Sequence, residues 1–177
     1  SLKVETSDLI NSAHRNIPCI KCHISETTGN RSIVGKDKTE RPCEMIKKVD
    51  CSNCHSGVSD IYLKSGHGQA YINKNPNAPY CTDCHGTHRI KTRYDDTSPT
   101  YRGEIPELCG KCHKESGKAV VNTNLKEIDA FLDYSSSVHG KGLNTKGLLV
   151  SAVCTDCHTS HNILKESDEN STIHPDN

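Results

Sequence analysis

The chain has very few of the residues from which a protein core is usually built. It contains no Trp, one Phe and one Met, and only 32% of its residues are hydrophobic. No apolar stretch approaches the length of a membrane span, and no basic run of the kind that binds nucleic acid is present. The 22 basic and 22 acidic residues give a formal net charge of zero. Such a polar composition is typical of disordered chains, unless something other than side chains supplies the core.

The N-terminus also lacks a targeting signal. The residues that follow Ser1 include neither the charged region nor the apolar region of a secretion leader. We therefore expect that any such leader has been removed from this chain.

Cysteine, in contrast, is abundant and regularly placed. Ten of the eleven Cys residues fall into five Cys-x-x-Cys-His motifs. This motif is the attachment signature of c-type haem, in which both thiols bond to the porphyrin and the adjacent His reaches the iron from one face. The sequence thus predicts five covalently bound haem c groups. They would be held by Cys19, Cys22 and His23; Cys51, Cys54 and His55; Cys81, Cys84 and His85; Cys109, Cys112 and His113; and Cys154, Cys157 and His158.

Two other uses of paired cysteines compete with this interpretation. Cys-x-x-Cys is also half of a structural zinc site, and closely spaced cysteines can form disulfides or a redox pair. A structural zinc site needs two such halves, so five copies do not pair evenly. Neither alternative requires a His directly after every second Cys, and the motif pattern therefore favours haem.

Five porphyrins would supply the apolar surface that the side chains lack. We expect a mostly irregular chain with short α-helices, wrapped around a haem core and containing little or no sheet. Without haem, the polypeptide is not expected to fold. The prediction is a single domain over residues 1–177, in which 1–50 carry the first haem and a loop, 51–108 the second and third haems, and 109–177 the fourth and fifth.

An internal repeat supports this division. The stretch Cys-Thr-Asp-Cys-His-x-x-His-x-Ile begins at Cys81 and again at Cys154, an offset of 73 residues. Upstream, Ser65-Gly66-His67-Gly68 corresponds to Ser137-Val138-His139-Gly140. By the same offset, the counterpart of the Cys109 motif would begin at position 182, beyond Asn177. We consider two interpretations: another subunit supplies the missing haem in a head-to-tail contact through its Asn16–Cys19 segment, or the repeat simply ends there.

The remaining histidines predict the second axial ligands. Five irons with a motif His on one face need five further ligands, and six His lie outside the motifs. His88 and His161 follow their motif His by only three residues, which is too short a link to pass around a porphyrin, so each is expected to ligate a neighbouring haem. The predicted distal ligands are His14, His67, His88, His139 and His161.

The sixth His and two sulfur-containing residues have no assigned role. His174 aligns with Tyr101 in the repeat, and we interpret it as a solvent-exposed tail residue or as a ligand for another subunit. Met45 is interpreted as a packing residue because enough His are present. Cys43 is either a buried free thiol or half of an intermolecular disulfide. Residues 120–134 carry Leu125, Ile128, Phe131 and Leu132 at helical spacing and predict a short amphipathic helix.

Ser-x-His-Gly followed by Cys-Thr-Asp-Cys-His-x-x-His-x-Ile resembles the multihaem cytochromes of metal-reducing and related microbes, across most of the chain. Two branches are relevant: subunits of extracellular cytochrome filaments, and small periplasmic pentahaem donors to terminal reductases. The resemblance implies electron transfer, an extracellular or periplasmic location, and redox partner proteins or an extracellular acceptor. The surplus His and the interrupted repeat favour the filament branch, as a head-to-tail homopolymer.

An enzyme is the main alternative. A multihaem oxyanion reductase needs a five-coordinate haem with an open face and a polar distal pocket. All five motifs retain their His, and enough His are present to close every iron. The sequence therefore predicts a carrier without a substrate of its own rather than an enzyme.

Overall fold

The computed structural model describes residues 4–23, 49–115, 117–121 and 129–177. Within these residues all regular structure is helical and no strand occurs, which confirms the prediction of short helices with little sheet. The predicted loop between the first two motifs, with Cys43 and Met45, lies outside the described residues.

The helices are short, and none exceeds nine residues. The N-terminal part contains α1 and α2, and the middle part contains η2, α3, α4 and α5. The C-terminal part contains η3 and α6 to α10. Their bounds are α1 Thr6–Ile10, α2 Cys19–Cys22, η2 Cys51–Asn53, α3 Ser56–Lys64, α4 Gly66–Ile72, α5 Cys81–His85, η3 Arg102–Glu104, α6 Ile105–Gly110, α7 Lys118–Val121, α8 Ala130–Ser136, α9 Val138–Lys146 and α10 Cys154–His158.

Local signals set the ends of these helices. Ser65 and Ser137 cap α4 and α9, and each hydroxyl accepts a hydrogen bond from the backbone N–H three residues later, at 3.1 Å. Gly147 ends α9 in the left-handed conformation, at φ 64° and ψ 22°. These caps fix where the helices begin and end, because hydrophobic packing contributes little to their stability.

The prediction of one helix over 120–134 is wrong at Asp129. This residue has φ −82° and ψ 76°, which is not helical, and its carboxylate accepts a hydrogen bond from the Leu132 N–H at 2.8 Å. Asp129 is therefore the N-cap of a new helix, α8, which carries Phe131 and Leu132. Leu125 and Ile128 lie outside the described residues.

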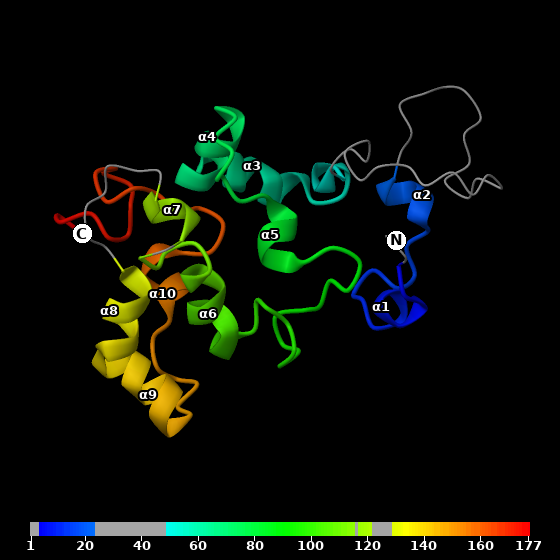
Figure 1. The fold of residues 1–177 in the computed structure, drawn as a ribbon. Coiled ribbons are helices and arrows are strands. Elements are labelled where there is room, and N and C mark those ends of the chain that lie inside the picture. The colour runs from blue at the N-terminus through cyan, green and yellow to red at the C-terminus, as the bar shows by residue number, and fades with distance from the viewer. Residues whose placement is uncertain (1–3, 24–48, 116, 122–128) are drawn as a thin grey trace.

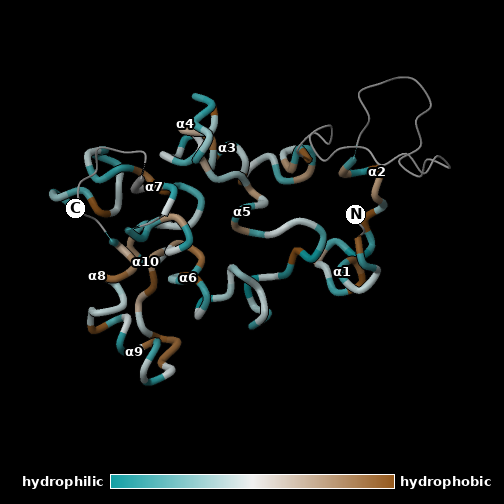
Figure 2. The backbone as a smooth tube through the Cα atoms, in the orientation of Figure 1, coloured by the Kyte–Doolittle hydropathy of each residue, from teal (hydrophilic) through white to brown (hydrophobic). Residues whose placement is uncertain are grey.

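Very few side chains are buried. Among the described residues only three hydrophobic side chains are buried: Ile105, Leu143 and Val153, from α6, α9 and the start of the last motif. Figure 2 shows apolar residues as short, separate stretches rather than as one continuous core. No helix in the described part of the chain is long and apolar enough to cross a bilayer.

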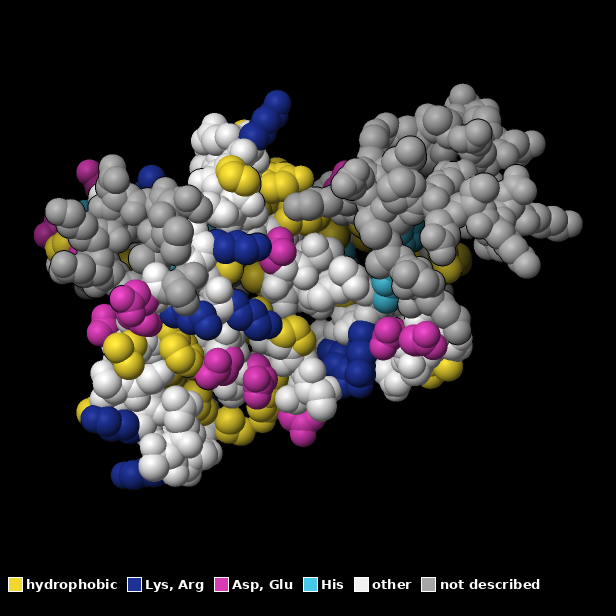
Figure 3. Space-filling view, in the orientation of Figure 1, with side chains coloured by type: hydrophobic (Ala, Val, Ile, Leu, Met, Phe, Trp, Pro, Cys, Tyr) yellow, Lys and Arg dark blue, Asp and Glu magenta, His cyan; other side chains and the backbone are white. Residues whose placement is uncertain are grey.

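The chain runs from one end of the molecule to the other. In Figure 1, α1 and α2 lie at one end with the N-terminus, whereas α8, α9 and the C-terminus lie at the opposite end. Helix α3 packs on α4 and, further along, α8 packs on α9, so the two copies of the repeat form the same helix pair. On the face shown in Figure 3, basic and acidic side chains are intermingled.

Candidate functional site

Each Cys-x-x-Cys-His motif forms a single helical turn. The backbone N–H of the motif His donates a hydrogen bond to the carbonyl of the first Cys in three motifs, at 2.9 Å for His23 and His55 and 3.0 Å for His113. The other two motifs form the short helices α5 and α10. Positions i, i+3 and i+4 of such a turn lie on one face. The two thiols and the imidazole of each motif are therefore presented together.

The two Cys-Thr-Asp-Cys-His helices share a further support. The Asp83 carboxylate accepts a hydrogen bond from the Tyr80 N–H at 2.6 Å, and Asp156 accepts one from the Val153 N–H at 2.7 Å. The carboxylates satisfy donors that a helix N-terminus would otherwise leave unpaired. This explains why Asp stands between the cysteines of both copies.

The central feature of the site is four pairs of imidazole rings. Every pair joins a motif His to a His outside the motifs. Ring centres lie 5.9 Å apart in one pair and 6.0 Å apart in the other three. The pairs are His55 with His14, His23 with His88, His113 with His67, and His85 with His161.

This separation fits one iron between the two rings. Metal–imidazole bonds of about 2.0–2.1 Å on both sides, with roughly 1 Å from each nitrogen to its ring centre, leave the centres roughly 6 Å apart. Two axial imidazoles with a porphyrin between them satisfy a haem iron. A structural zinc site instead needs four ligands, and the described residues contain no group of three or more His, Cys, Asp or Glu able to hold a metal.

Burial prepares three of these rings for ligation. Desolvation lowers the pKa of His67, His85 and His113, and the neighbouring imidazoles His113, His161 and His158, respectively, lower them further. The neutral imidazole is the form that binds metals. All three rings are thus biased toward the ligand form.

The motif thiols identify which motifs are neighbours. In the first copy, Cys51 contacts Cys81, and burial, followed by the charge of Cys81, raises the pKa of Cys51 to about 11. In the second copy, a hydrogen bond between the Cys109 and Cys154 thiols raises the pKa of Cys109 and lowers that of Cys154 to about 7. The first cysteines of two motifs therefore meet in each copy.

Further electrostatic interactions connect the first copy to the first motif and to the second copy. The thiol of Cys51 is influenced by Cys22 of the first motif, and that of Cys84 by Cys112 of the fourth. Such interactions operate only at short range. Together with the contacts within each copy, they order the five motifs in space as they are ordered in the chain.

The predicted distal ligands differ in where the structure places them. His14, His67, His88 and His161 each face a motif His from a different part of the chain, and His88 and His161 do not face the motif His that they follow. His139 and His158 are both exposed, and among the described residues neither belongs to one of the four imidazole pairs. His174 is not the exposed tail residue of the sequence interpretation, because its side chain is only 18% exposed and its Nδ1 accepts a hydrogen bond from the Asp176 N–H.

Several supporting residues had not been identified from the sequence. Tyr62 donates a hydrogen bond to the Pro79 carbonyl at 2.5 Å, and Tyr134 donates one to the Ala152 carbonyl at 3.0 Å, which fastens the helix before each donor His to the following motif. Extending the repeat upstream would have revealed this tyrosine pair. Arg102, in contrast, has no sequence signal.

Arg102 joins the two copies. Its guanidinium donates two hydrogen bonds to the Asp156 carboxylate, at 3.0 and 2.7 Å, and others to the Leu149 and Ser151 carbonyls at 2.6 and 2.9 Å. This fork geometry suits arginine better than lysine. The guanidinium, followed by the Val153 N–H, lowers the pKa of Asp156.

The Arg102–Asp156 pair predicts a pH-dependent stability. Because the folded pKa of Asp156 lies below its unfolded value, its contribution is present above about pH 3.9 and is lost as the pH falls through the folded pKa. The pair is partly exposed, so we expect Asp156→Asn to lower the free energy of unfolding by about 0.5–1 kcal/mol at pH 7. Denaturant unfolding of the holoprotein between pH 3 and 7 measures this difference.

Asp83→Asn is the matched control, because Asp83 accepts the equivalent backbone hydrogen bond, from Tyr80, whereas the guanidinium of Arg102 bonds to Asp156. Near neutral pH, Asp156→Asn should lower the free energy of unfolding more than Asp83→Asn does. In acid, the two variants should lower it by the same amount. Equal effects at all pH values would show that Arg102 adds nothing.

Thr159 is a strained position beside the last motif. It follows His158 with φ 64° and ψ −175°, a region that is almost exclusive to glycine, and its Oγ1 is buried without a hydrogen-bond partner. Its counterpart in the first copy is Gly86, with φ 78° and ψ −169°. The same backbone conformation therefore occurs in both copies. Glycine adopts it without strain in the first copy, whereas threonine is strained by it in the second.

We expect Thr159→Gly to raise the free energy of unfolding by about 1 kcal/mol, because relief of strain exceeds the added entropy of the unfolded chain. The reverse change at the equivalent site, Gly86→Thr, should lower it by about 1–3 kcal/mol. Thermal unfolding of both variants measures the effect. A destabilised Thr159→Gly protein would contradict the strain argument.

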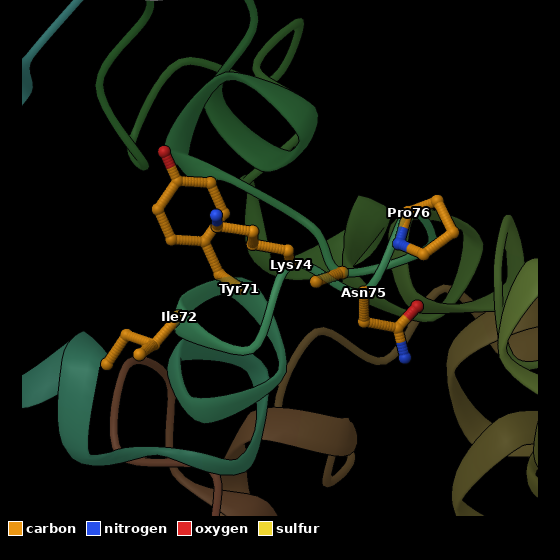
Figure 4. A pocket seen from close by; sticks show the side chains of 6 residues that line it. Tyr71, Ile72, Lys74, Asn75 and Pro76 are labelled. Carbon is orange, nitrogen blue, oxygen red and sulfur yellow. The ribbon is translucent and has the colours of Figure 1, made fainter.

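The structure also has a surface pocket that none of the motif or paired histidine residues lines. It is at the C-terminal end of α4, and Figure 4 shows the side chains that line it: Tyr71, Ile72, Lys74, Asn75, Pro76 and Ala78. None of these residues is a Cys or a His. The Tyr71 ring stacks on Tyr80 with centres 4.9 Å apart, which makes this region a support for the Cys81 helix.

Comparison with protein-family models, with curated proteins and with solved structures finds no match to this chain.

Proposed function

We propose that the protein transfers electrons through five covalently bound haem c groups. The observation that carries the proposal is the set of four imidazole pairs at 5.9–6.0 Å, each with one ring from a Cys-x-x-Cys-His motif. The structure thus leaves room for an iron beside each of four pairs of thiols. The ten motif cysteines, none of them in a disulfide, supply the attachment points.

A haem iron supplies reversible one-electron chemistry, and two axial imidazoles favour low potentials. The polypeptide holds each motif ring by the single turn of its motif, and it holds His67 by the Ser65-capped helix α4. Each motif also interacts with the next motif of the chain through its cysteines, so that each has a neighbour for electron transfer. A series of closely spaced sites suits conduction from the first haem to the fifth.

The setting that we propose is a subunit of an extracellular filament, with a soluble periplasmic carrier as the alternative. The exposed His139 and His158 support the filament, because groups without partners in one chain can be completed by contact with another. Electron microscopy of the natively purified holoprotein separates the two: ordered filaments support the wire, and dispersed small particles support the carrier.

The experiment that tests electron transfer itself begins with the intact mass. We expect the secreted protein to carry five haems, to show a low-spin haem spectrum, and to be reduced and reoxidised reversibly in a potential titration. Metal analysis provides the control, since zinc in place of iron would overturn the proposal. A haem-free but folded protein would overturn it as well.

One observation favours a second candidate function. His158 is the one motif His without an imidazole partner among the described residues, and an iron there would have the open face that a reductase needs. Stoichiometric binding of cyanide or carbon monoxide, together with turnover of nitrite or a related oxyanion, would support an enzyme. Binding without turnover would leave electron transfer as the function.

A further inference from the structure

The turn between α9 and α10 exposes three consecutive apolar side chains. Leu148 is 46% exposed, Leu149 44% and Val150 88%. The Ser151 N–H donates a hydrogen bond to the Leu148 carbonyl at 2.9 Å, which closes a β-turn with Leu149 and Val150 at its centre. We call residues 148–151 the apolar turn. Its tip carries leucine and valine at positions where Gly, Pro, Asn, Asp and Ser usually predominate.

Hydrogen bonds to α9 and from η3 hold the backbone of the apolar turn in place. The Leu148 N–H donates to the Gly142 carbonyl of α9 at 3.0 Å. The Arg102 guanidinium of η3 donates to the carbonyls of Leu149 and Ser151, at 2.6 and 2.9 Å. The exposed side chains are therefore presented on a fixed backbone rather than on a loose loop.

The first copy has the same turn with polar side chains. The Ala78 N–H donates to the Asn75 carbonyl at 3.0 Å, and the Asn75 N–H donates to the Ala70 carbonyl, also at 3.0 Å. The residue before each turn has a positive φ, of 57° at Lys74 and 64° at Gly147. The residues 73 positions before the three apolar ones are Asn75, Pro76 and Asn77. Because the same backbone forms with polar residues, folding does not require apolar side chains in the second copy.

Contact with a haem does not explain the apolar side chains either. Cys154, Cys157 and His158 occupy positions i, i+3 and i+4 of α10 and so share one face of that helix. Asp156 lies on the other face, and it is Asp156 to which Arg102 joins the apolar turn. The turn is therefore tied to the side of α10 that faces away from the thiols and the imidazole.

The sequence that flanks the apolar turn is basic. Between Asp133 and Asp156 the chain contains no acidic residue, and it has the exposed Lys141 and Lys146 on α9. Asp156 itself pairs with Arg102 at 2.7 Å. On the face shown in Figure 3, the described side chains over α9 include basic but no acidic ones. A chain without net charge thus has positive charge next to this turn.

We infer that the apolar turn docks the protein on the surface of a bilayer that contains anionic lipid. The three apolar side chains would enter the boundary between headgroups and acyl chains, and Lys141 and Lys146 would lie among the lipid phosphates. Helix α9 lies at the end of the molecule opposite the N-terminus, so residues 4–23 would lie furthest from the bilayer (Figure 1). The inference goes beyond electron transfer and does not depend on it.

A protein partner fits this turn less well. A stable protein interface buries about 800 Å² on each partner, which three aliphatic side chains on one turn cannot supply. Binding to a bilayer depends on the apolar area inserted and on attraction to anionic lipid, and it needs no surface of complementary shape. A single turn with flanking lysines meets these requirements.

The test is co-sedimentation of the haem-loaded protein with vesicles, either of phosphatidylcholine alone or of equal parts of phosphatidylcholine and phosphatidylglycerol. We expect binding to the anionic vesicles that weakens as salt is added. The double variant Leu148→Asn, Val150→Asn carries the residues of the first copy, and its partition onto these vesicles should fall at least about tenfold. The double variant Lys141→Gln, Lys146→Gln should lose the preference for anionic lipid.

Ile72→Asn is the matched control. Ile72 is 52% exposed on α4 of the first copy, and the corresponding residue of α9 is Asn144. This variant should bind vesicles like the parent protein. The single variant Val150→Asn changes a side chain that is 88% exposed, so it should keep the parent haem spectrum and still weaken binding several-fold.

Three results would overturn the inference. The first is a parent protein that sediments with neither kind of vesicle. The second is a loss of binding in Ile72→Asn equal to that in the variants of the apolar turn, or no loss in any of them. The third is self-association that Val150→Asn abolishes, without vesicle binding, because this would assign the turn to a contact with a second copy.

Discussion

Replacing His161 with alanine is expected to turn one low-spin haem of the holoprotein into a high-spin haem. The ring of His161 lies parallel to that of His85, at an interplanar angle of 8° and with centres 6.0 Å apart, so it is placed to be the second axial ligand of the third haem. No other imidazole ring contacts His85 in the described part of the chain. The haem therefore loses its second strong ligand, and the whole low-spin signal of one iron in five should disappear. Magnetic circular dichroism and the absorbance of the high-spin band measure the change.

His174→Ala is the matched control, because His174 is near the same end of the chain but faces its own turn through Asp176. Its spectrum should stay that of the parent protein. Added imidazole should restore the low-spin spectrum of His161→Ala. If His161→Ala stays fully low-spin without added ligand, the pairing with His85 is wrong.

The second large effect is expected from Gly68→Ala. Gly68 is buried at the start of α4, and a Cβ there would collide with the Tyr62 carbonyl oxygen and approach the Leu63 Cα to 2.6 Å. Both are backbone groups, so relief requires α3 and α4 to separate. We expect the free energy of unfolding to fall by at least about 2 kcal/mol. The displaced helix also carries His67, so the fourth haem should become partly high-spin.

The paired control is Gly57→Ala on the neighbouring helix α3, where a Cβ would meet no atom within 4 Å. Alanine is favoured over glycine in a helix, so this variant should be more stable by about 0.5–1 kcal/mol. Denaturant unfolding of the two holoproteins compares a buried with an open glycine on one helix pair. Equal stabilities would show that α3 and α4 tolerate separation.

Gly68 also shows what could be predicted from the sequence. The recurrence of Ser-x-His-Gly identified two equivalent units, and the structure explains its letters: Ser caps the helix, the His of the first copy faces a distant motif, and Gly allows the approach of the Tyr62 or Tyr134 carbonyl. The scarcity of apolar residues predicted short helices with little sheet, and this prediction is confirmed. Both inferences depend on local chemistry, which is encoded in adjacent residues.

The pairing of the histidines could not be predicted. The short link excludes the adjacent motif as a partner for His88, but it does not indicate His23, which lies 65 residues earlier in the chain. Such choices depend on how the units dock, through contacts such as Gly66 with Ile163 and Arg102 with Asp156. These contacts join residues that lie far apart in the chain, so only the three-dimensional arrangement identifies the partners.

The four imidazole pairs join each motif His to a His that lies earlier or later in the chain, and this has a consequence for how the protein would mature. On the proposed function, the first and third haems receive their second ligand from residues that are synthesised later, His88 and His161. The second and fourth haems receive theirs from residues synthesised earlier, His14 and His67. If the chain is exported from its N-terminus, the first and third haems therefore stay half-ligated until the next stretch of chain arrives, and each newly arrived unit completes the haem before it. The haems would thus complete their ligation stepwise from the N-terminus to the C-terminus. An arrested export intermediate should be recognisable by a single high-spin haem near its most recently exported end.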